Sequence, residues 1–384
     1  MKILFIAHDR GLGGATSSLL NIIECINRIH PEYEIHVLVP TGELKYKSQL
    51  EKLNCRVIQK KYYLLAGWPT DRSRMSVLLH RVKWLAKEKL SNNVVAIQVA
   101  HYAKKHGIDI IHSNSSIIDI GALISKYSGI PHIWHFREFL QEDQNAIMWC
   151  SQSYFNGLAL KHTKQIIAVS KAVKTKYDDY FGEKIKVVYN GVPQIKEREN
   201  IAKKNDDRVN IIEVGKVCTG KGQDVTLKAM AQLVHSGCTN IRLLLIGNPE
   251  FDFGKSLYNE IHEYVDIVGQ KDITEVNRIR MELGDIEVVS SKAEAFGRVT
   301  VEAMMCGLPV VGSNSGGTPE LIENNVTGVL YTQGDYNDLA EKLRMLIENK
   351  ELRTSIGNRA KSVVGYYSIE RCVEEILDIY RLIM

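Results

Sequence analysis

The chain has 384 residues, of which 45% are hydrophobic and 24% are charged, and its formal net charge is +4 at pH 7. This length is too great for one ordinary domain and suits two domains, each with enough apolar residues for its own core. No apolar run approaches the ~18 residues needed to span a bilayer, and the opening MKILFIAH is too short for the apolar core of a signal peptide. We therefore expect a cytoplasmic protein that is not integral to a membrane.

Cysteine and aspartate spacing bears on metals and disulfides. The seven cysteines are scattered, odd in number and without a Cys-x-x-Cys pair. That pattern argues against a disulfide framework and a structural zinc site, so reduced packing residues are expected. No two aspartates stand two positions apart. An Asp-x-Asp metal motif is therefore missing, and the sequence implies neither a metal nor another cofactor.

Charge is divided unequally along the chain. Residues 1–186 carry 26 Lys and Arg against 16 Asp and Glu, a net +10, whereas residues 187–384 carry 23 against 29, a net −6. The basic first half is where a negatively charged partner is expected.

The first predicted strand, Lys2 to Ala7, is a continuous apolar run typical of a central parallel strand. A glycine-rich turn follows, with Gly13 and Gly14 directly before an amphipathic helical stretch, Ala15 to Ile23. Such a turn lets backbone N–H groups approach an anion. It lacks the third glycine of the dinucleotide fingerprint, and no acidic residue ends the next strand, Glu34 to Pro40, which disfavours an NAD-dependent enzyme.

The segment 68–90 interleaves cations with apolar and aromatic residues. At helical spacing it forms one apolar face surrounded by lysines and arginines, made of Leu78, Leu79, Val82, Leu85 and Ala86. A basic amphipathic helix of this kind can lie in a membrane interface, which would fit an enzyme with a lipid-linked acceptor. A domain helix whose apolar face packs inward fits the same pattern, and the sequence leaves both interpretations open.

Titratable residues gather at the end of a later strand. Strands are predicted at Asp109 to Ser116 and at Pro131 to Phe139, and the second ends with His135, Arg137 and Glu138. A lone histidine is more often a packing residue. At a strand end beside arginine and glutamate, however, it becomes a candidate for function.

A change in composition marks the domain boundary. A buried strand, Thr163 to Ser170, and an Asn-Gly turn close a first domain that covers residues 1–193. The stretch 194–209 is charged, almost without apolar residues, and is predicted to be a linker. The order of strand, glycine, basic loop and helix then restarts, which predicts a second α/β domain over residues 210–365.

The loop that opens the second domain concentrates positive charge. It runs from Gly215 to Gly222 and places Lys216 and Lys221 before a helix that begins near Asp224. Such a cluster suits a diphosphate and would stabilise charge on a departing nucleotide. Two solvated surface lysines are the simpler alternative.

The stretch Ser290 to Pro309 is the most informative of the chain. An apolar run before it and a helical run within it predict the order strand, loop, helix. Glu294 would then lie on the loop at the carboxyl end of a strand, where ligands bind in open α/β sheets, and Glu302 inside the helix. Carboxylates there would accept hydrogen bonds from sugar hydroxyls, whereas they would repel phosphate.

These motifs carry a family resemblance. Glu294-x-Phe296-Gly297 with Glu302-Ala303, followed by Gly307-x-Pro309-Val310-Val311 and Gly316-Gly317-x-Pro319-Glu320, resembles the donor-site signature of the retaining glycosyltransferases of family four. The resemblance spans nearly the whole chain. It implies the GT-B type of α/β fold, with two Rossmann-like doubly wound domains that face each other across a donor-binding cleft. It also implies that the C-terminal helix, within 366–384, packs back on the N-terminal, acceptor-side domain.

The resemblance also implies roles for residues of the first domain. Gly13 and Gly14 would approach the donor diphosphate or its sugar, and His135 would contact the sugar near the reacting carbon. Arg137 and Glu138 would orient His135 or meet the acceptor.

In the second domain, Lys216 and Lys221 would neutralise the leaving diphosphate, although the family usually has arginine where this chain has Lys216. The catalytic set would then be His135, Glu294, Lys216 and Lys221. The donor-binding set that the resemblance implies, beside Gly13 and Gly14, is Gly215, Lys216, Lys221, Val268, Gln270, Lys271, Glu294, Phe296, Gly297, Arg298, Val299 and Glu302.

The expected function is that of a metal-independent, retaining hexosyltransferase. It would move a hexose or N-acetylhexosamine from a nucleotide-diphosphate sugar, with a UDP-sugar favoured, to a glycan or lipid-linked acceptor. Cell-surface polysaccharide or glycoconjugate biosynthesis at the inner face of the membrane is the expected setting, with no nucleic-acid partner. Two alternatives remain, a nucleotide-sugar 2-epimerase and a non-catalytic glycosyltransferase-like partner subunit.

Overall fold

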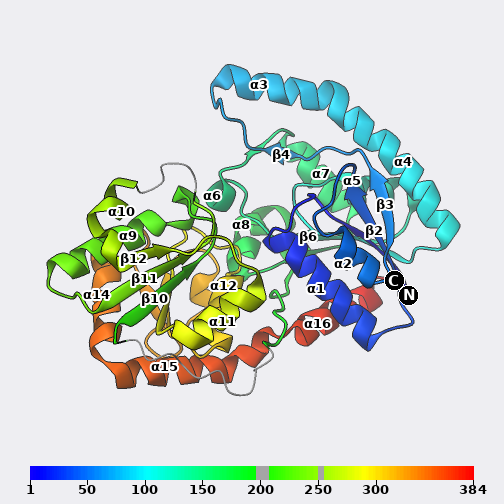
Figure 1. The fold of residues 1–384 in the computed structure, drawn as a ribbon. Coiled ribbons are helices and arrows are strands. Elements are labelled where there is room, and N and C mark those ends of the chain that lie inside the picture. The colour runs from blue at the N-terminus through cyan, green and yellow to red at the C-terminus, as the bar shows by residue number, and fades with distance from the viewer. Residues whose placement is uncertain (196–206, 250–254) are drawn as a thin grey trace. The chain divides into compact units, whose positions relative to one another are not determined.

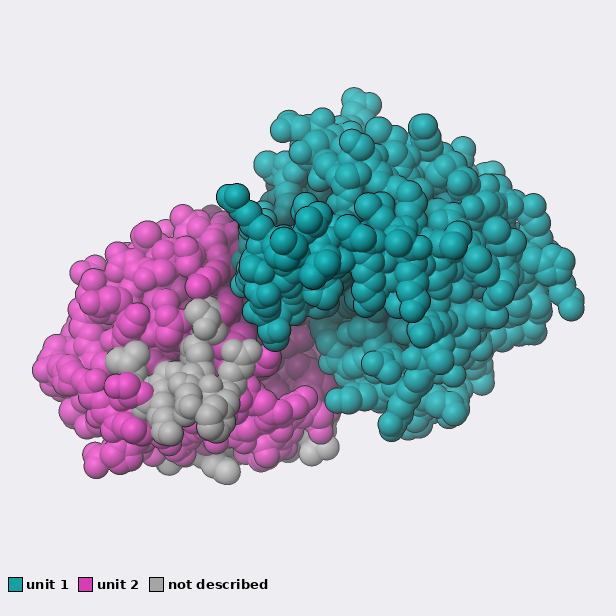
Figure 2. All heavy atoms as spheres, turned by 90° about the horizontal axis from the view of Figure 1, so that it is seen from above, with its two compact units in different colours: residues 1–191, 369–384 teal, residues 192–368 magenta. Residues whose placement is uncertain are grey.

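The computed structural model describes residues 1–195, 207–249 and 255–384, so most of the predicted linker lies outside the described residues. The chain divides into two compact units, which Figure 2 colours separately. Unit 1 contains residues 1–191 and 369–384, and unit 2 contains residues 192–368. The boundaries predicted at residues 193 and 366 lie within a few residues of these divisions.

Unit 1 is built on a seven-stranded sheet in which every neighbouring pair is parallel, in the order β3-β2-β1-β5-β6-β8-β9. Its strands are β1 (Lys2–Ile6), β2 (Glu34–Pro40), β3 (Arg56–Lys60), β5 (Ile110–Ser113), β6 (His132–Phe136), β8 (Gln165–Ala168) and β9 (Ile185–Val187). A separate antiparallel pair joins β4 (Ala66–Gly67) and β7 (Ile147–Met148). The central strands are buried on both faces, which explains the continuous apolar run of β1, while β5 and β6 also bury three histidines and a serine, namely His112, Ser113, His132 and His135.

The helices of unit 1 pack around this sheet (Figure 1). They are α1 (Gly14–Ile29), α2 (Lys47–Lys52), α3 (Arg74–Lys83), α4 (Lys89–His106), α5 (Ile120–Ser128), α6 (Gln141–Gln144), α7 (Gln152–His162), α8 (Lys171–Phe181) and α16 (Ile369–Ile383). A π-helical turn, η1 (Trp84–Glu88), joins α3 to α4, and a 3₁₀ turn, η2 (Gly182–Lys184), precedes β9.

The last helix, α16, completes the core of unit 1. Its apolar face, which includes Val373, Ile376, Leu377 and Tyr380, packs in the same buried cluster as β1, β2 and α1. The chain end therefore shares a hydrophobic core with the first thirty residues.

Unit 2 is a six-stranded parallel sheet in the order β12-β11-β10-β13-β14-β15. Its strands are β10 (Val209–Val214), β11 (Ile241–Ile246), β12 (Val265–Ile267), β13 (Ile286–Val289), β14 (Val310–Ser313) and β15 (Val329–Tyr331). Its helices are α9 (Gln223–His235), α10 (Lys255–Ile261), α11 (Ile273–Leu283), α12 (Arg298–Met305), α13 (Thr318–Leu321), α14 (Tyr336–Glu348) and α15 (Lys350–Val363). Three 3₁₀ turns are η3 (Thr219–Lys221), η4 (His262–Tyr264) and η5 (Val364–Tyr367).

Each sheet reverses its strand order at one point. In unit 1, β1 lies between β2 and β5, and in unit 2, β10 lies between β11 and β13. At such a switch point the loops after the two central strands diverge and leave a crevice at the carboxyl edge. The predicted class, two doubly wound Rossmann-like domains, is confirmed, and the loops after β10 and β13 lie where a ligand would bind in unit 2.

The structure contradicts one of the two interpretations of segment 68–90. The predicted apolar face is not packed inward, since Leu78, Leu79, Val82 and Leu85 are exposed by 54%, 62%, 52% and 57%. Trp84 and Glu88, which lie in the π-helical turn, are the buried side chains of this segment. The inward-packing alternative is therefore wrong, and the exposed face needs another explanation. Among the described helices, none is long and apolar enough to cross a bilayer.

Candidate functional site

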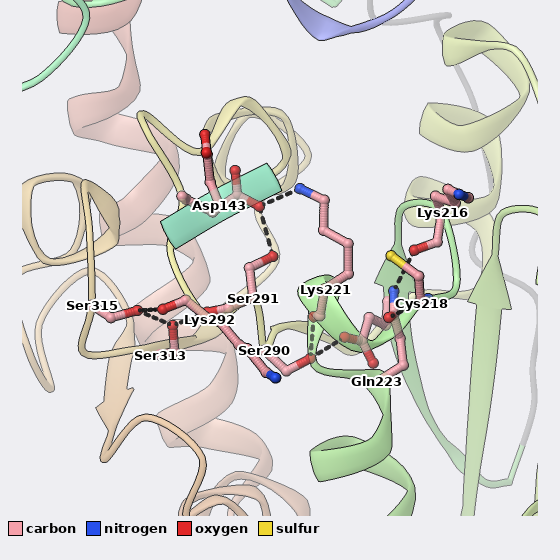
Figure 3. A network of polar contacts seen from close by, with 12 residues as sticks. Asp143, Lys216, Cys218, Lys221, Gln223, Ser290, Ser291, Lys292, Ser313 and Ser315 are labelled. Atoms are coloured by element: carbon pink, nitrogen blue, oxygen red, sulfur yellow. Dashed lines mark hydrogen bonds and ion pairs between the residues drawn. The ribbon is translucent and has the colours of Figure 1, made fainter. Parts of the chain in front are cut away.

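Two neighbouring loops at the switch point of unit 2 bring a cation and a carboxylate together. Lys221 ends the loop after β10, and Glu294 lies on the loop after β13. The Lys221 ammonium donates to Glu294 Oε1 at 2.6 Å, and Ser291 Oγ donates to the same oxygen at 2.6 Å. Figure 3 shows the Lys221 side chain extended across the gap between the two loops. Two of the predicted catalytic residues thus form one ion pair.

The charge state of Glu294 follows from this pairing. Burial disfavours its ionised form, but the Lys221 ammonium and the hydrogen bonds from Lys221 and Ser291 outweigh that cost and hold its pKa below the ordinary value. Glu294 is therefore an ionised acceptor at neutral pH, as hydroxyl recognition requires.

Glycines set the position of these loops. Gly317 N donates to Glu294 O at 2.7 Å, and a Cβ on Gly316 would come within 2.4 Å of the same carbonyl. On the other side, Gly222 has a φ of +77° at the start of α9, and a Cβ there would lie 2.0 Å from Ser290 O. Only glycine permits these close approaches. The backbone of the Gly-Gly loop and of the α9 N-terminus therefore fixes where Lys221 and Glu294 meet.

Glu302 belongs to a different network. It lies in α12, where Arg280 Nη1 contacts its Oε2 at 3.3 Å and Arg298 Nη2 contacts its Oε1 at 3.4 Å. Arg280 also pairs with Glu287 through two hydrogen bonds of 2.6 and 2.8 Å, and both side chains are fully buried. The two predicted glutamates thus have different partners, and Glu302 is held by two arginines from α11 and α12.

The remaining predicted donor residues of unit 2 lie on the same edge of the sheet or beside it. Lys216 is exposed on the loop after β10, and its carbonyl accepts from Gln223 at 3.2 Å. Gln270 follows β12 and its Oε1 accepts from Asn248 at 2.9 Å. Phe296 is buried against Tyr367. Gly297 is buried at the N-cap of α12. The others are exposed or partly exposed on the loops or at the start of α12, namely Gly215, Val268, Lys271, Arg298 and Val299.

In unit 1, His135 lies at the end of β6 and is completely buried. Its Nδ1 is 3.2 Å from His112 Nε2 and 3.2 Å from Arg137 Nη2. His112 in turn contacts Tyr380 Oη through its Nδ1 at 2.6 Å. A chain of hydrogen bonds therefore links His135 to α16.

This geometry assigns the proton of His135. Burial, together with the charge of Arg137 and the neighbouring His112, holds the pKa of His135 well below its ordinary value, so the imidazole is neutral. A guanidinium can only donate, so Nδ1 accepts and the single proton lies on Nε2. That buried Nε2 has no hydrogen-bond partner among the described residues. His135 therefore presents an unsatisfied N–H donor, which is the group that would bind a ligand oxygen.

Arg137 and Glu138 have structural partners. Arg137 donates to Asn114 Oδ1 at 2.8 Å and to Asn190 Oδ1 at 2.6 Å. Glu138 accepts from the hydroxyls of Ser115 and Ser116 and from the Ser116 backbone. Glu138 thus anchors the loop after β5, and Arg137 orients His135.

Gly13 and Gly14 lie at the start of α1, where Gly13 is the N-cap. A Cβ on Gly14 would meet no atom within 4 Å, and Gly13 has an ordinary φ of −79°. Neither backbone strain nor packing within unit 1 therefore requires glycine here. The open space in front of this helix N-terminus suits the close approach of an anionic ligand.

Sequence reasoning missed several positioning residues. Glu213, a carboxyl inside an apolar strand, accepts from Ser290 Oγ, and burial raises its pKa to about 8. The charged residue in the run VNIIEV was the available signal. Ser291 and Arg280 gave no local signal, because their partners lie on other elements. Across the described ranges, no group of three or more His, Cys, Asp or Glu side chains is placed to hold a metal ion.

Comparisons with known proteins agree with this architecture. The model of Glycosyltransferase Family 4 matches residues 12–194, and that of Glycosyl transferases group 1 matches residues 194–363. A glycosyltransferase of Methanocaldococcus jannaschii is 30% identical over 319 residues, which are 79% of this chain and 85% of the relative. The chain belongs to the group 1 glycosyltransferases of family four. An N-acetyl-α-D-glucosaminyl L-malate synthase of Bacillus anthracis is 28% identical over 73% of each protein.

Solved structures show the same fold. The Anabaena protein HepE in complex with UDP aligns over 100% of both chains with a TM-score of 0.78 and 22% identity. The lipopolysaccharide outer core galactosyltransferase WaaB aligns over 100% of both chains with a TM-score of 0.72 and 18% identity. The GT-B fold inferred from the sequence is thereby confirmed, and the protein is a glycosyltransferase.

Proposed function

We propose that this glycosyltransferase moves a hexose or N-acetylhexosamine from a UDP-sugar to a glycan or lipid-linked acceptor, with retention of anomeric configuration and without a metal. The observation that carries the proposal is the Lys221–Glu294 pair at the switch point of unit 2. An ammonium beside an ionised carboxylate, next to the N-terminus of α9, supplies one group for a diphosphate and one for sugar hydroxyls.

Each residue has a defined task in this proposal. Lys221, with Lys216, stabilises the charge that grows on the departing diphosphate, and the Gly13–Gly14 backbone adds N–H groups. Glu294 accepts from sugar hydroxyls, and Glu302 accepts from the ribose. In the retaining reaction the bond from the anomeric carbon to the phosphate oxygen breaks, and the acceptor oxygen attacks the same face. The acceptor proton passes to the leaving phosphate, so no enzyme nucleophile is required.

His135 supports a ligand role in unit 1. A neutral imidazole with a buried, unsatisfied Nε2–H can donate to a sugar hydroxyl, whereas an imidazolium would repel a developing positive charge on the anomeric carbon. Burial, with the charge of Arg137 and the neighbouring His112, keeps this histidine neutral, and the contact with Arg137 fixes the tautomer.

The names of similar proteins support the choice of donor. Solved structures of HepE hold UDP, UDP-glucose, or UDP and glucose. The Bacillus anthracis relative is named N-acetyl-α-D-glucosaminyl L-malate synthase, and WaaB is named a lipopolysaccharide outer core galactosyltransferase. The HepE structures favour a UDP-sugar as the donor, and the name of WaaB favours an acceptor in glycan or glycoconjugate biosynthesis.

A thermal-unfolding panel of UDP, GDP, ADP, CDP and NAD, each with and without magnesium, tests the donor. We expect UDP alone to raise the unfolding temperature, by a shift that magnesium leaves unchanged. A ligand at a hundred times its dissociation constant adds about 2.7 kcal/mol of stability, which is readily measured. A shift with a different nucleotide, or one that depends on magnesium, would contradict the proposed donor or the metal-independent binding.

Analysis of the reaction products distinguishes the proposed transferase from two other functions. A nucleotide-sugar 2-epimerase would convert UDP-N-acetylglucosamine alone into its epimer, whereas the proposed transferase leaves it unchanged without acceptor. A non-catalytic partner subunit would show neither reaction nor a UDP-dependent shift. Nuclear magnetic resonance of a transfer product, with an α-linkage from an α-linked donor, would establish retention.

Peripheral contact with the inner face of the membrane is part of the same proposal. Its support is the exposed apolar face of α3 and η1, formed by Leu78, Leu79, Val82 and Leu85, with arginines and lysines on the same segment. Apolar side chains would enter the interface while the cations contact anionic headgroups.

Replacement of Leu78 and Val82 by aspartate should abolish binding to anionic vesicles. The two side chains stand one helical turn apart, so the change places two negative charges in the centre of the apolar face. Co-sedimentation with phosphatidylglycerol vesicles measures the bound fraction. Leu160→Asp on α7, also an exposed leucine of unit 1, is the matched control and should bind as the wild type does. Unchanged sedimentation of the double variant would rule out this face as the membrane contact.

A further inference from the structure

A cavity of about 560 Å³ lies in unit 1 at the base of α3, away from His135 and the α1 N-terminus. Residues of the helical segment 81–89 form one side, and the β7–α7 connection, residues 148–154, forms the other. Trp84 and Trp149 are buried in its wall, whereas Arg81 and Leu85 are exposed at its edge. The cavity has no role in sugar transfer as proposed above.

Two cations, Arg81 and Lys89, line this cavity. Neither Arg81 nor Lys89 makes an ion pair with a carboxylate in the described part of the chain. Glu88, the acidic residue of the same segment, is paired instead with Lys83 at 3.2 Å, and neither of these two residues lines the cavity. Asp119 interacts electrostatically with Lys89 but does not line the cavity, and its carboxylate accepts from the Tyr154 hydroxyl at 2.9 Å. The cavity wall is therefore positively charged.

The three aromatic side chains of the cavity wall already make contacts through their rings. His80 stacks on Trp149 with ring centroids 4.9 Å apart, and the Lys89 ammonium lies over the Tyr154 ring at 4.6 Å. Trp84 meets the Tyr154 ring edge to face. A sugar that binds by stacking would need a free aromatic face. The arrangement favours an anion over a neutral glycan.

Hydrogen-bond donors are available beside the two cations. Trp84 Nε1–H is buried and has no partner among the described residues. The first turn of the eleven-residue helix α7 lies at the cavity, where its lining includes Ser151, Gln152 and Tyr154. Helix N-termini favour anions. The π-helical turn that brings Trp84 inward is a rare conformation that often occurs at functional sites.

An apolar surface continues from the cavity. Leu85 lines it, and Leu78, Val82 and Leu85 stand at positions i, i+4 and i+7 of the exposed face, with Arg81 beside them. Figure 1 shows α3, η1 and α4 as one nearly continuous rod along this side of unit 1. A ligand with an anionic end and an apolar end would satisfy both surfaces.

We infer that this cavity binds the phosphate headgroup of an anionic lipid, with Arg81, Lys89 and Trp84 Nε1–H as donors, while an acyl chain lies along Leu85, Val82 and Leu78. The inference rests on the proposed membrane contact of segment 68–90. It adds to that contact a site that binds one lipid molecule. It does not depend on which sugar or nucleotide the enzyme uses.

Calorimetric titration of the full-length chain with dihexanoyl phosphatidic acid, kept below its micelle concentration, tests the site. We expect saturable one-to-one binding. The double variant Arg81→Gln/Lys89→Gln should weaken it about tenfold or more, because two charge-assisted hydrogen bonds are lost. Arg74→Gln/Lys87→Gln, with the same change in charge on the same helical rod but outside the cavity lining, is the control and should bind as the wild type does.

Four results would overturn the inference. They are the absence of saturable binding, equal loss in both double variants, equally tight binding of dihexanoyl phosphatidylcholine, and inorganic phosphate binding as tightly as the lipid. Vesicle sedimentation separates this site from the membrane proposal. If vesicle binding persists but the monomeric lipid does not bind, the membrane contact stands and the cavity is not a lipid site. If the UDP-dependent shift is absent while the lipid binds, only the donor proposal fails.

Discussion

Replacement of Lys221 by methionine should lower kcat/KM for sugar transfer by about two to three orders of magnitude, while the protein remains folded. Methionine keeps most of the length of the side chain but removes the charge that lies 2.6 Å from Glu294 and would face the leaving diphosphate. Steady-state kinetics with the UDP-sugar found by the nucleotide panel measures the loss. The UDP-dependent rise in unfolding temperature should disappear in parallel.

The pH profile of the same variant gives an independent readout. In the wild type, Lys221 offsets the burial of Glu294 and keeps its pKa below the ordinary value. Without that cation, burial dominates, so the pKa of Glu294 rises and the residual activity should increase as the pH is raised. Lys228→Met, on the exposed side of α9 where it pairs with Asp224, is the control and should retain activity. Near-normal turnover by Lys221→Met would exclude the diphosphate assignment.

Replacement of Arg280 by methionine should destabilise the protein by about 3–5 kcal/mol. Arg280 and Glu287 are both completely buried and share two hydrogen bonds, and Arg280 also contacts Glu302. The substitution leaves the Glu287 carboxylate buried without its partner, which is one of the most costly changes that a folded protein undergoes. Urea denaturation at pH 8 measures the free energy of unfolding.

The destabilisation should depend on pH in a defined direction. Burial already raises the pKa of Glu287 above its ordinary value in spite of Arg280, and removal of the arginine raises it further. Between the unfolded and the folded pKa, the native state holds a proton that the unfolded state lacks, so stability falls as the pH rises. The loss should therefore be smaller at pH 5 than at pH 8. Arg278→Met, an exposed arginine of the same helix with two surface ion pairs, should change stability little at either pH. A pH-independent loss in Arg280→Met would contradict the explanation.

Much of this structure could be predicted from local patterns. Apolar runs such as Lys2 to Ala7 gave the buried strands, because parallel strands are covered on both faces. The order strand, loop, helix placed Glu294 before α12, and glycines marked the loops where backbone atoms approach closely. Such signals lie within a few residues of one another, so they can be recognised in the sequence without a structure.

Contacts between distant segments could not be predicted in this way. Lys221 and Glu294 are 73 residues apart, and His112 and Tyr380 are 268 apart, so their meeting depends on strand order and on the return of α16. The exposure of Leu78 and Leu79 could not be predicted either, because helical periodicity defines an apolar face but does not show which residues cover it. Arg280 has a partner on β13, and nothing in its own helix distinguishes it from the exposed Arg278.

The return of the chain end to unit 1 has a consequence for biosynthesis. A ribosome makes residues 1–191 first, but the part of their core that includes Ile376 and Tyr380 is translated after the whole of unit 2. Unit 1 therefore cannot complete its core during most of translation, and chains that terminate early would expose apolar surface to chaperones and proteases. Such chains would also lack Tyr380, the hydroxyl that ends the hydrogen-bond chain to His135. Only a chain translated through α16 can thus hold His135 in this hydrogen-bond network.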